Sequence, residues 1–302
     1  MSQKPLVVVF GSTGAQGGSV ANSLLGTDRY RVRALTRNVN SEKAKELAAK
    51  GAEVFKCDLF EKKEIENALQ GAEIAYSIVG KGVHEEERLG KLIADIAKAA
   101  GIKWIIYSSF PDLATESNGK YPTINLTGKN YVEKYIKTLG IPNVTFVYLG
   151  YYANNFERIV YKEQKDNGDV EIALPYLKED DVLAIIDVDD LGPIVSKILE
   201  QGPAKWNGKA IPIASEYVNM KHIIDCLTKA SGKRHILKTL DDESIKKGYP
   251  RYNQEIREMY GWIKEFDFFG KDKSNGDISI VKQLHPNILS YEQYVKKAYE
   301  KK

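Results

Sequence analysis

The sequence predicts an α/β fold: a doubly wound, parallel β-sheet with helices on both faces, followed by a smaller, mainly helical C-terminal lobe. Three observations lead to this prediction. Short apolar runs alternate with helix-length amphipathic segments over the first 150 residues, as repeated βα units do. A glycine follows several of the helical segments, which is typical of helix C-termini. After residue 150 this alternation stops, and the last 70 residues are rich in aromatic side chains.

The strands of the first part are expected at residues 6–10, 31–36, 52–57, 73–79, 104–108 and 144–149. The first of them, LVVVF, is a continuous apolar run, as expected of a parallel strand that is buried on both faces. The helices are expected at residues 15–25, 41–50, 61–70, 85–100 and 126–139. Right-handed crossovers place such helices on both faces of the sheet.

The second part is less regular. Residues 151–181 show no clean period, and residues 185–192 lead into a helix that ends near Leu199. Asp189 or Asp190 is the expected cap of this helix, with Pro193 in its first turn.

A further strand is expected at residues 209–214, which could rejoin the sheet, and a helix at residues 219–231. We therefore expect one domain over residues 1–153, to which residues 182–214 return. A smaller lobe over residues 154–302 should cover the carboxyl ends of the strands.

Composition narrows the function. The net charge is +3, and no block of like charges marks a nucleic-acid arm, so direct nucleic-acid binding is not expected. Cys57 and Cys226 have neither disulfide nor metal spacing, and the four histidines lie far apart, so no metal site is expected. No apolar stretch approaches the ~18 residues that cross a bilayer. We expect a cytoplasmic protein; presence in the nucleus is neither indicated nor excluded.

A glycine-rich loop follows the first strand. Gly11, Gly14 and Gly17 come directly after the apolar run and open the first helix, which is the context of a dinucleotide-binding Rossmann motif. Glycine lets the backbone approach a pyrophosphate, and the helix N-terminus offers unpaired N–H groups. The alternative is a tight turn without a ligand.

The end of the second strand indicates which dinucleotide binds. An NAD site usually has an acid there, whereas this chain has Thr36-Arg37. A guanidinium suits the 2′-phosphate of NADP(H) because its planar fork makes two charge-assisted hydrogen bonds. The alternative is that Arg37 is merely solvated.

The ends of the third and fourth strands are the remaining candidates. Asp58 could bond the adenine amino group or cap the helix that starts near Glu61, and sequence reasoning does not separate the two roles. Val79-Gly80 ends the fourth strand, where glycine would let the backbone pass close to the ribose; an ordinary turn is the alternative.

The segment from Gly11 to Val20, with Gln16 inside the glycine loop, resembles the NmrA-like branch of the atypical short-chain dehydrogenase/reductase superfamily. Further matches are spread over nearly the whole chain: Thr36-Arg37-Asn38, Asp58-Leu59, Tyr107-Ser108, Gly128-Lys129, Asp190-Leu-Gly-Pro193 and Gly248-Tyr-Pro250. The animal NmrA-like NADPH-sensor proteins are the members that the chain resembles most.

The resemblance implies NADP(H) binding with little or no turnover, in a protein that senses redox state or regulates partners such as transcription factors. The cofactor contacts that it implies are Gly11, Ser12, Thr13, Gly14, Ala15, Gln16, Gly17, Arg37, Asp58, Leu59, Val79, Gly80, Arg88, Lys129, Tyr152 and Asn155. The sensor proteins carry a second cation shortly after the arginine. Here that position is Ser41, with Lys43 two residues on. The set of cations that would hold the 2′-phosphate, called the phosphate clamp below, is therefore either looser or completed by Lys43.

Catalysis is the weakest expectation. Short-chain reductases pair a tyrosine with a lysine four residues later, which lowers the tyrosine pKa. Four residues before Lys129 stands Asn125, which cannot act as a general acid. Lys129 could still hold the ribose or could be a solvated helix lysine. Tyr121 is a second weak candidate, in a polar stretch over residues 110–125 that could fold over the cofactor.

These observations favour an NADP(H)-binding redox sensor or regulatory protein, with a regulatory protein partner and no membrane contact, and leave room for a homodimer. The alternative is an NADPH-dependent reductase of small carbonyls or quinones. The aromatic run over residues 260–269 could line a pocket, but the core of the lobe is the better interpretation.

Overall fold

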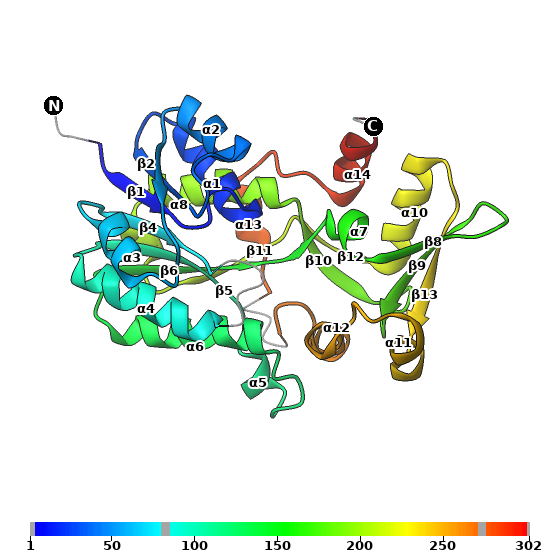
Figure 1. Ribbon diagram of the computed structural model, residues 1–302. Coiled ribbons are helices and arrows are strands. Elements are labelled where there is room, and N and C mark those ends of the chain that lie inside the picture. The colour runs from blue at the N-terminus through cyan, green and yellow to red at the C-terminus, as the bar shows by residue number, and fades with distance from the viewer. Residues whose placement is uncertain (1–3, 80–84, 271–275, 301–302) are drawn as a thin grey trace.

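A computed structural model of the chain describes residues 4–79, 85–270 and 276–300. Seven parallel strands form the main sheet in the order β11-β6-β5-β4-β1-β2-β3 (Figure 1). Their bounds are β1 (Leu6–Val9), β2 (Arg31–Thr36), β3 (Glu53–Lys56), β4 (Ile74–Ser77), β5 (Trp104–Ser109), β6 (Asn143–Leu149) and β11 (Ala210–Ile213). The predicted α/β fold is confirmed.

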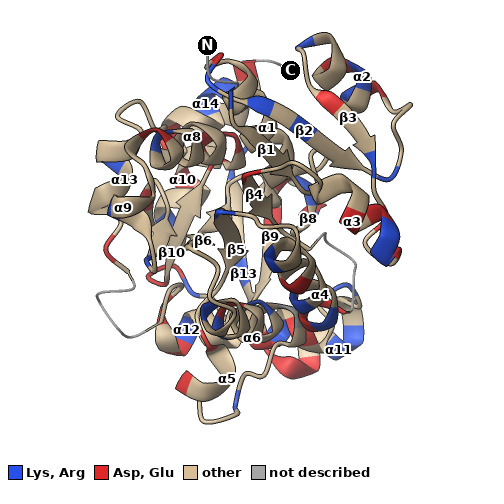
Figure 2. Cartoon of the chain, turned by 90° about the vertical axis from the view of Figure 1, so that its left-hand side faces the viewer, with Lys and Arg blue, Asp and Glu red and all other residues tan. Residues whose placement is uncertain are grey.

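Helices cover both faces of this sheet because its strands are apolar on both. Val7 and Val9 pack with the helices of one face, and Val8 and Phe10 pack toward the other. The first face carries α1 (Ala15–Leu25), α2 (Glu42–Ala49) and α8 (Leu191–Gln201). The second carries α3 (Lys62–Leu69), α4 (Glu86–Ala99) and α6 (Ile124–Thr138). Charges of both signs are interspersed on the outer helices such as α3 and α4 (Figure 2).

The chain returns to the main sheet after residue 190. Strand β11 pairs with β6, so the strand expected at residues 209–214 does rejoin the sheet. The cap expected for α8 is wrong in detail. Asp187 caps the short 3-10 turn η1 (Val188–Asp190) by accepting the Asp189 N–H at 3.1 Å. Asp190 stands at the N-cap of α8, but its carboxylate contacts the His285 ring at 3.0 Å.

The second part of the chain contains β-strands that were not predicted. Two three-stranded sheets lie within residues 151–240, in the orders β12-β10-β7 and β13-β9-β8. Their strands are β7 (Tyr151–Tyr152), β8 (Tyr161–Gln164), β9 (Val170–Pro175), β10 (Val182–Ile186), β12 (Glu216–Asn219) and β13 (His235–Leu240). The other helices are α5 (Leu113–Glu116), α7 (Asn155–Arg158), α9 (Pro203–Trp206), α10 (Met220–Ser231), α11 (Asp242–Gly248), α12 (Gln254–Phe266), α13 (Ser279–Leu284) and α14 (Tyr291–Glu300).

The aromatic run near the C-terminus forms core. Tyr260, Trp262, Phe268 and Phe269 are all buried, which supports the core interpretation over a solvent-open pocket. Among the described helices, none is both long and apolar enough to span a bilayer.

Candidate dinucleotide site

The glycine loop joins β1 to α1 in a conformation that needs glycine at two positions. Gly11 has a φ of +62°, which side chains rarely adopt. A Cβ on Gly17 would lie 2.4 Å from the carbonyl oxygens of Phe10 and Gly11. Helix α1 starts after Gly14 without a side-chain cap. Its first N–H groups are therefore free to bind an anion, and the positive end of the helix dipole favours one.

Two hydroxyls and one amide fix this loop to its surroundings. Ser12 donates its hydroxyl to the Leu35 carbonyl oxygen at 2.8 Å, and the hydroxyls of Thr13 and Thr36 lie 3.2 Å apart. The Gln16 amide accepts from the Tyr76 hydroxyl at 2.7 Å and donates to the hydroxyl of Tyr152 in β7. The Gln16 side chain is thus occupied by hydrogen bonds to two tyrosines of the protein, and only its backbone N–H is available to hydrogen-bond a ligand.

A cleft of about 540 Å³ opens beside the loop. Its lining includes Ser12, Thr13 and Gly14 of the loop, Lys43 of α2, and Asp189. The cleft therefore begins at the uncapped end of α1 and runs between α1 and α2.

Two cations at this edge of the sheet have no partner within the described residues. Arg37 and Lys43 are both exposed, and no hydrogen bond or ion pair holds either charge there. Ser41 instead has a local role. It caps α2 by accepting the Ala44 N–H at 3.3 Å and donates to the Asn38 carbonyl oxygen at 3.0 Å.

Asp58 follows β3, at the corner expected for adenine. Its carboxylate accepts the Phe60 N–H at 3.1 Å, while its own N–H donates to Glu64 at 2.7 Å. Helix α3 begins after Glu61 without a side-chain cap, so the capping role considered for Asp58 is wrong. Leu59 is half-buried against the core.

The fourth strand ends in the core. Val79 is buried after β4, and Gly80 lies outside the described residues. Arg88 on α4 pairs with Glu85 and lies over the Phe60 ring, 5.9 Å from its centroid. Arg88 therefore faces the turn between β3 and α3.

Lys129 forms an ion pair with the buried Glu86. Its Nζ lies 2.7 Å from Glu86 Oε1, which also accepts from the Tyr107 hydroxyl at 3.3 Å. The Glu86 side chain is only 5% exposed. Burial raises the pKa of Glu86, and the ammonium of Lys129 and the hydroxyl of Tyr107 oppose that rise. Sequence reasoning missed Glu86 because nothing in the acidic run 85–87 distinguishes it from a solvated residue.

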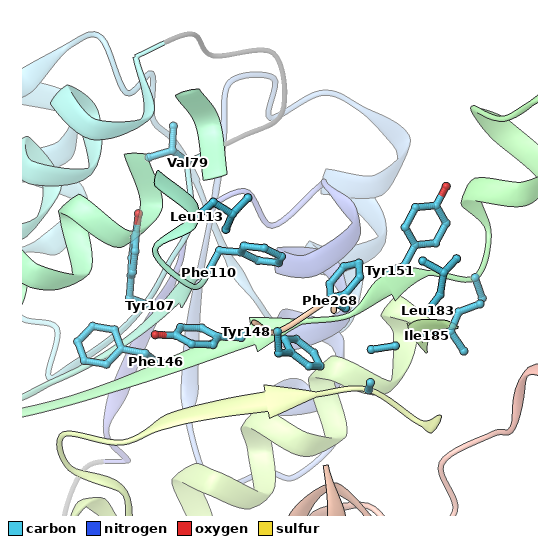
Figure 3. Packing of buried hydrophobic residues seen from close by; sticks show 14 of the residues in the cluster. Val79, Tyr107, Phe110, Leu113, Phe146, Tyr148, Tyr151, Leu183, Ile185 and Phe268 are labelled. Carbon is cyan, nitrogen blue, oxygen red and sulfur yellow. The ribbon is translucent and has the colours of Figure 1, made fainter. Parts of the chain in front are cut away.

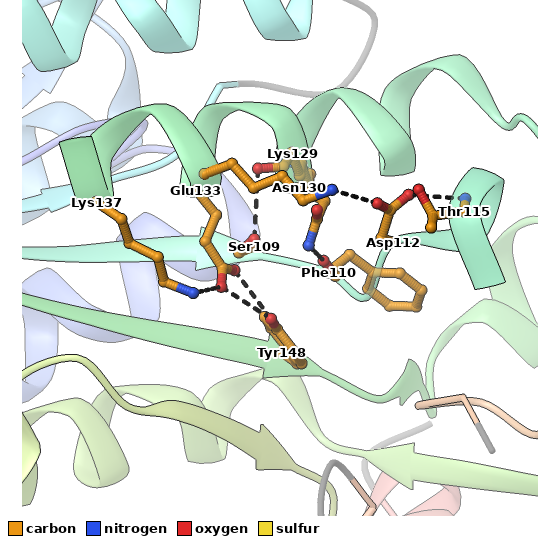
Figure 4. A network of polar contacts seen from close by, with 10 residues as sticks. Ser109, Phe110, Asp112, Thr115, Lys129, Asn130, Glu133, Lys137 and Tyr148 are labelled. Carbon is orange, nitrogen blue, oxygen red and sulfur yellow. Dashed lines mark hydrogen bonds and ion pairs between the residues drawn. The ribbon is translucent and has the colours of Figure 1, made fainter. Parts of the chain in front are cut away.

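A polar network fixes the middle of α6 to the end of β5 (Figure 4). The Ser109 hydroxyl donates to the Lys129 carbonyl oxygen at 3.4 Å, and the Asn130 amide donates to the Phe110 carbonyl oxygen at 3.1 Å. This network positions the backbone at Lys129 beside the carboxyl end of β5.

Tyr121 is attached to the lobe. Its hydroxyl donates to Glu265 at 2.7 Å, and its ring meets Phe266 edge-on at 6.2 Å. The stretch over residues 110–125, expected to be irregular, contains α5 and docks on α12. Asn155 begins α7, which follows β7 and Tyr152 in the chain. The structure thus brings the loop, Arg37, Lys43 and Tyr152 to one end of the sheet and turns Tyr121 toward α12.

The model of the NmrA-like family matches residues 3–295 of this chain, which is nearly all of it. The chain belongs to the NmrA-like family. An NmrA-like family domain-containing protein of Dictyostelium discoideum is 33% identical over 305 residues, with 98% of each chain covered. The NmrA-like family domain-containing oxidoreductase lnaB of Aspergillus flavus is 30% identical, over 76% of this chain and 74% of lnaB.

Solved structures of the family extend the comparison. NmrA, described as a negative transcriptional regulator, has been solved in complex with NADP, and that structure is 26% identical to this chain with a TM-score of 0.82. Its complex with NAD is 27% identical, with a TM-score of 0.84. Both cover 99% of this chain and 96% of NmrA.

Proposed function

We propose that this NmrA-like chain binds NADP(H) and acts as a redox-sensing regulatory protein with little or no turnover. The observation that carries the proposal is the uncapped start of α1, which opens on a cleft lined by Lys43. Lys43 and the exposed Arg37, which follows β2, have no charge partner among the described residues. Unpaired cations beside an anion-binding helix end suit a dinucleotide with an additional phosphate. NADP and NAD complexes of NmrA support a dinucleotide as the ligand, and the preference for NADP(H) rests on the two cations.

The loop, Arg37 and Lys43 fit the group: the backbone of the first turn of α1 would hold the pyrophosphate, and the two cations the 2′-phosphate. NADPH supplies a hydride when bound. This chain offers little to direct that hydride. Asn125 stands where a reductase has its tyrosine, and the Nζ of Lys129 contacts Glu86 at 2.7 Å. Tyr121 donates its hydroxyl to Glu265 and so is not directed toward the loop.

The second candidate is a reductase of small carbonyls or quinones. The name of the A. flavus relative, an oxidoreductase, favours it. So does the placement of Lys129 beside the carboxyl end of β5, because a lysine there can bind a ribose. A reductase would need a general acid from another residue, because Asn125 cannot act as one.

Calorimetry and turnover test the proposal together. We expect NADPH and NADP⁺ to bind at least tenfold more tightly than NADH and NAD⁺. Absorbance at 340 nm should show no NADPH oxidation above background with a panel of quinones and aldehydes. Equal affinity for the two dinucleotides would refute the phosphate clamp, and brisk turnover would favour the reductase.

A further inference from the structure

The carboxyl ends of β5 and β6 meet an aromatic side chain from the lobe. In open α/β sheets, ligands bind in the crevice outside these strand ends. Here Phe110 directly follows β5, and Tyr151 lies just beyond β6. Between them stands Phe268, which comes from the turn after α12 (Figure 3).

Three rings surround Phe268 edge-on. Their centroids lie 5.6 Å away for Phe110, 6.4 Å for Tyr151 and 5.3 Å for Phe269, with interplanar angles of 76°, 89° and 79°. Such T-shaped contacts at 4.5–7 Å are the favourable arrangement of aromatic rings. Phe110 and Phe268 keep only 6% and 5% of their surface exposed, and Leu113 beside them has none. The place is a closed aromatic cage, and a phenyl ring fills it.

A short turn, rather than a helix or strand, supplies this ring. Asp267 has a φ of +68°, unusual for a residue with a side chain, and its carboxylate accepts the Phe268 N–H at 2.8 Å. Trp262 adds a long hydrogen bond of 3.4 Å to the Phe268 carbonyl oxygen. Gly270, with a φ of +88°, ends the turn. Withdrawing Phe268 thus requires rearrangement of four residues, 267–270, and leaves α12 intact.

We propose that this cage is a binding site for an uncharged, planar aromatic molecule and that Phe268 is its built-in competitor. The rings of Phe110 and Tyr151 lie outside the turn and would stay in place, so a flat ring without charge could take over the two edge-on contacts that Phe268 makes with them. The proposal rests on the proposed function in one respect: the site lies at the strand ends toward which a dinucleotide on the glycine loop would extend. A ring that fills this place also gives a steric reason for low turnover.

The test is equilibrium dialysis with 2-naphthol, followed by its fluorescence, on the full chain with and without NADP⁺. Phe268→Ala should bind 2-naphthol at least tenfold more tightly than the unmutated protein. Phe268→Leu, which removes the ring and keeps most of the volume, should show a smaller gain and serves where the alanine variant unfolds. Phe146→Ala, which empties a fully buried ring position on β6, is the matched control and should show no gain.

Equal binding by Phe268→Ala, Phe268→Leu and Phe146→Ala would overturn the proposal. NADPH calorimetry on the same samples keeps the two ideas apart. If no variant binds NADPH while Phe268→Ala still gains 2-naphthol without cofactor, the dinucleotide proposal fails and the aromatic site stands. If all bind NADPH and none gains 2-naphthol, the reverse holds.

Discussion

At the scale of single residues, the charge of Arg37 should decide which dinucleotide binds. Its guanidinium is exposed and, among the described residues, unpaired, so a phosphate would meet no competing carboxylate. A charge-assisted hydrogen bond contributes about 1.5–3 kcal/mol, or roughly ten- to a hundredfold in affinity. We expect Arg37→Ala to weaken NADPH by that factor in calorimetric titration and to leave NADH nearly unchanged.

Lys43→Ala in the same titration decides whether the second cation belongs to the clamp. A further loss confined to NADPH would assign it a share of the phosphate. Arg29→Ala is the matched control because Arg29 pairs with Glu200 at 3.5 Å, at the other end of β2. If Arg29→Ala lost a comparable share of its NADPH affinity, the effect of Lys43→Ala would come from the change in net charge and not from a phosphate contact.

The two cysteines should be inert in the folded protein. Burial raises the pKa of Cys57 to about 12 and that of Cys226 to about 11. Since the thiolate is the reactive form, neither thiol should react with Ellman's reagent at pH 8 until the chain unfolds. Raising the pH toward 11 should speed the reaction of Cys226 first. Rapid native labelling at pH 8 would contradict this and would open a thiol-based route to redox sensing.

The site was predictable from sequence where its chemistry is local. The glycines follow a strand and open a helix, and the need for Gly11 and Gly17 depends on backbone within a few residues. The Lys129–Glu86 pair was not predictable, because the two residues stand 43 positions apart in the sequence, on different helices. The contacts of Asp58 were not predicted: its carboxylate accepts the Phe60 N–H instead of capping α3, and its own N–H donates to Glu64.

At the scale of elements, the position of α1 depends on α8. The Ser19 hydroxyl of α1 donates to the Asp189 carbonyl oxygen and accepts the Gly192 N–H, both at 2.8 Å. A Cβ on Gly192 would lie 2.1 Å from the Ser19 carbonyl oxygen, and backbone cannot yield as a side chain does. The two helices are therefore in direct backbone contact beside the cleft.

Gly192→Ala should push these helices apart. Overpacking of this kind destabilises by about 1–3 kcal/mol, which urea denaturation would measure. NADPH affinity should fall as well, because the displaced helix carries the glycine loop. Gly248→Ala is the control, since its Cβ would meet no atom within 4 Å. A stable Gly192→Ala variant with unchanged affinity would show that α1 is held by the sheet alone.

The elements themselves were predictable to different degrees. Strand β1 is apolar throughout and β5 is apolar up to its two final serines, and every residue of both strands is buried. Strand β8, with sequence YKEQ, is mostly exposed and shows no period, so nothing local reveals it. It exists because it pairs with β9, and β13 joins the same sheet some 60 residues later. Short strands with distant partners are the ones that sequence reasoning missed.

At the scale of the whole molecule, two sets of hydrogen bonds join the main sheet and its helices to segments beyond residue 150 near the proposed site, in addition to the Phe110–Phe268 contact. One is the Gln16 amide between Tyr76 and Tyr152. The other is the stretch over residues 111–123, which docks on α12: Tyr121 donates to Glu265 and the Thr123 N–H donates to Glu258, at 2.7 and 2.8 Å. A ligand on the loop would therefore act on both parts.

A sensor needs an element whose conformational equilibrium the ligand shifts, and the shift is limited by the ligand's difference in affinity for the two states. The stretch over residues 111–123 is our candidate because it leads from β5 to the helix that carries Lys129. We expect NADPH to slow amide hydrogen exchange in residues 111–123 and in α12 together, since the two are docked. Tyr121→Phe removes the hydroxyl bonded to Glu265 and leaves the Thr123–Glu258 hydrogen bond, so it should weaken the coupling and reduce the response of α12 to NADPH. If protection is confined to the glycine loop and Arg37, the chain binds the dinucleotide without a switch in this segment.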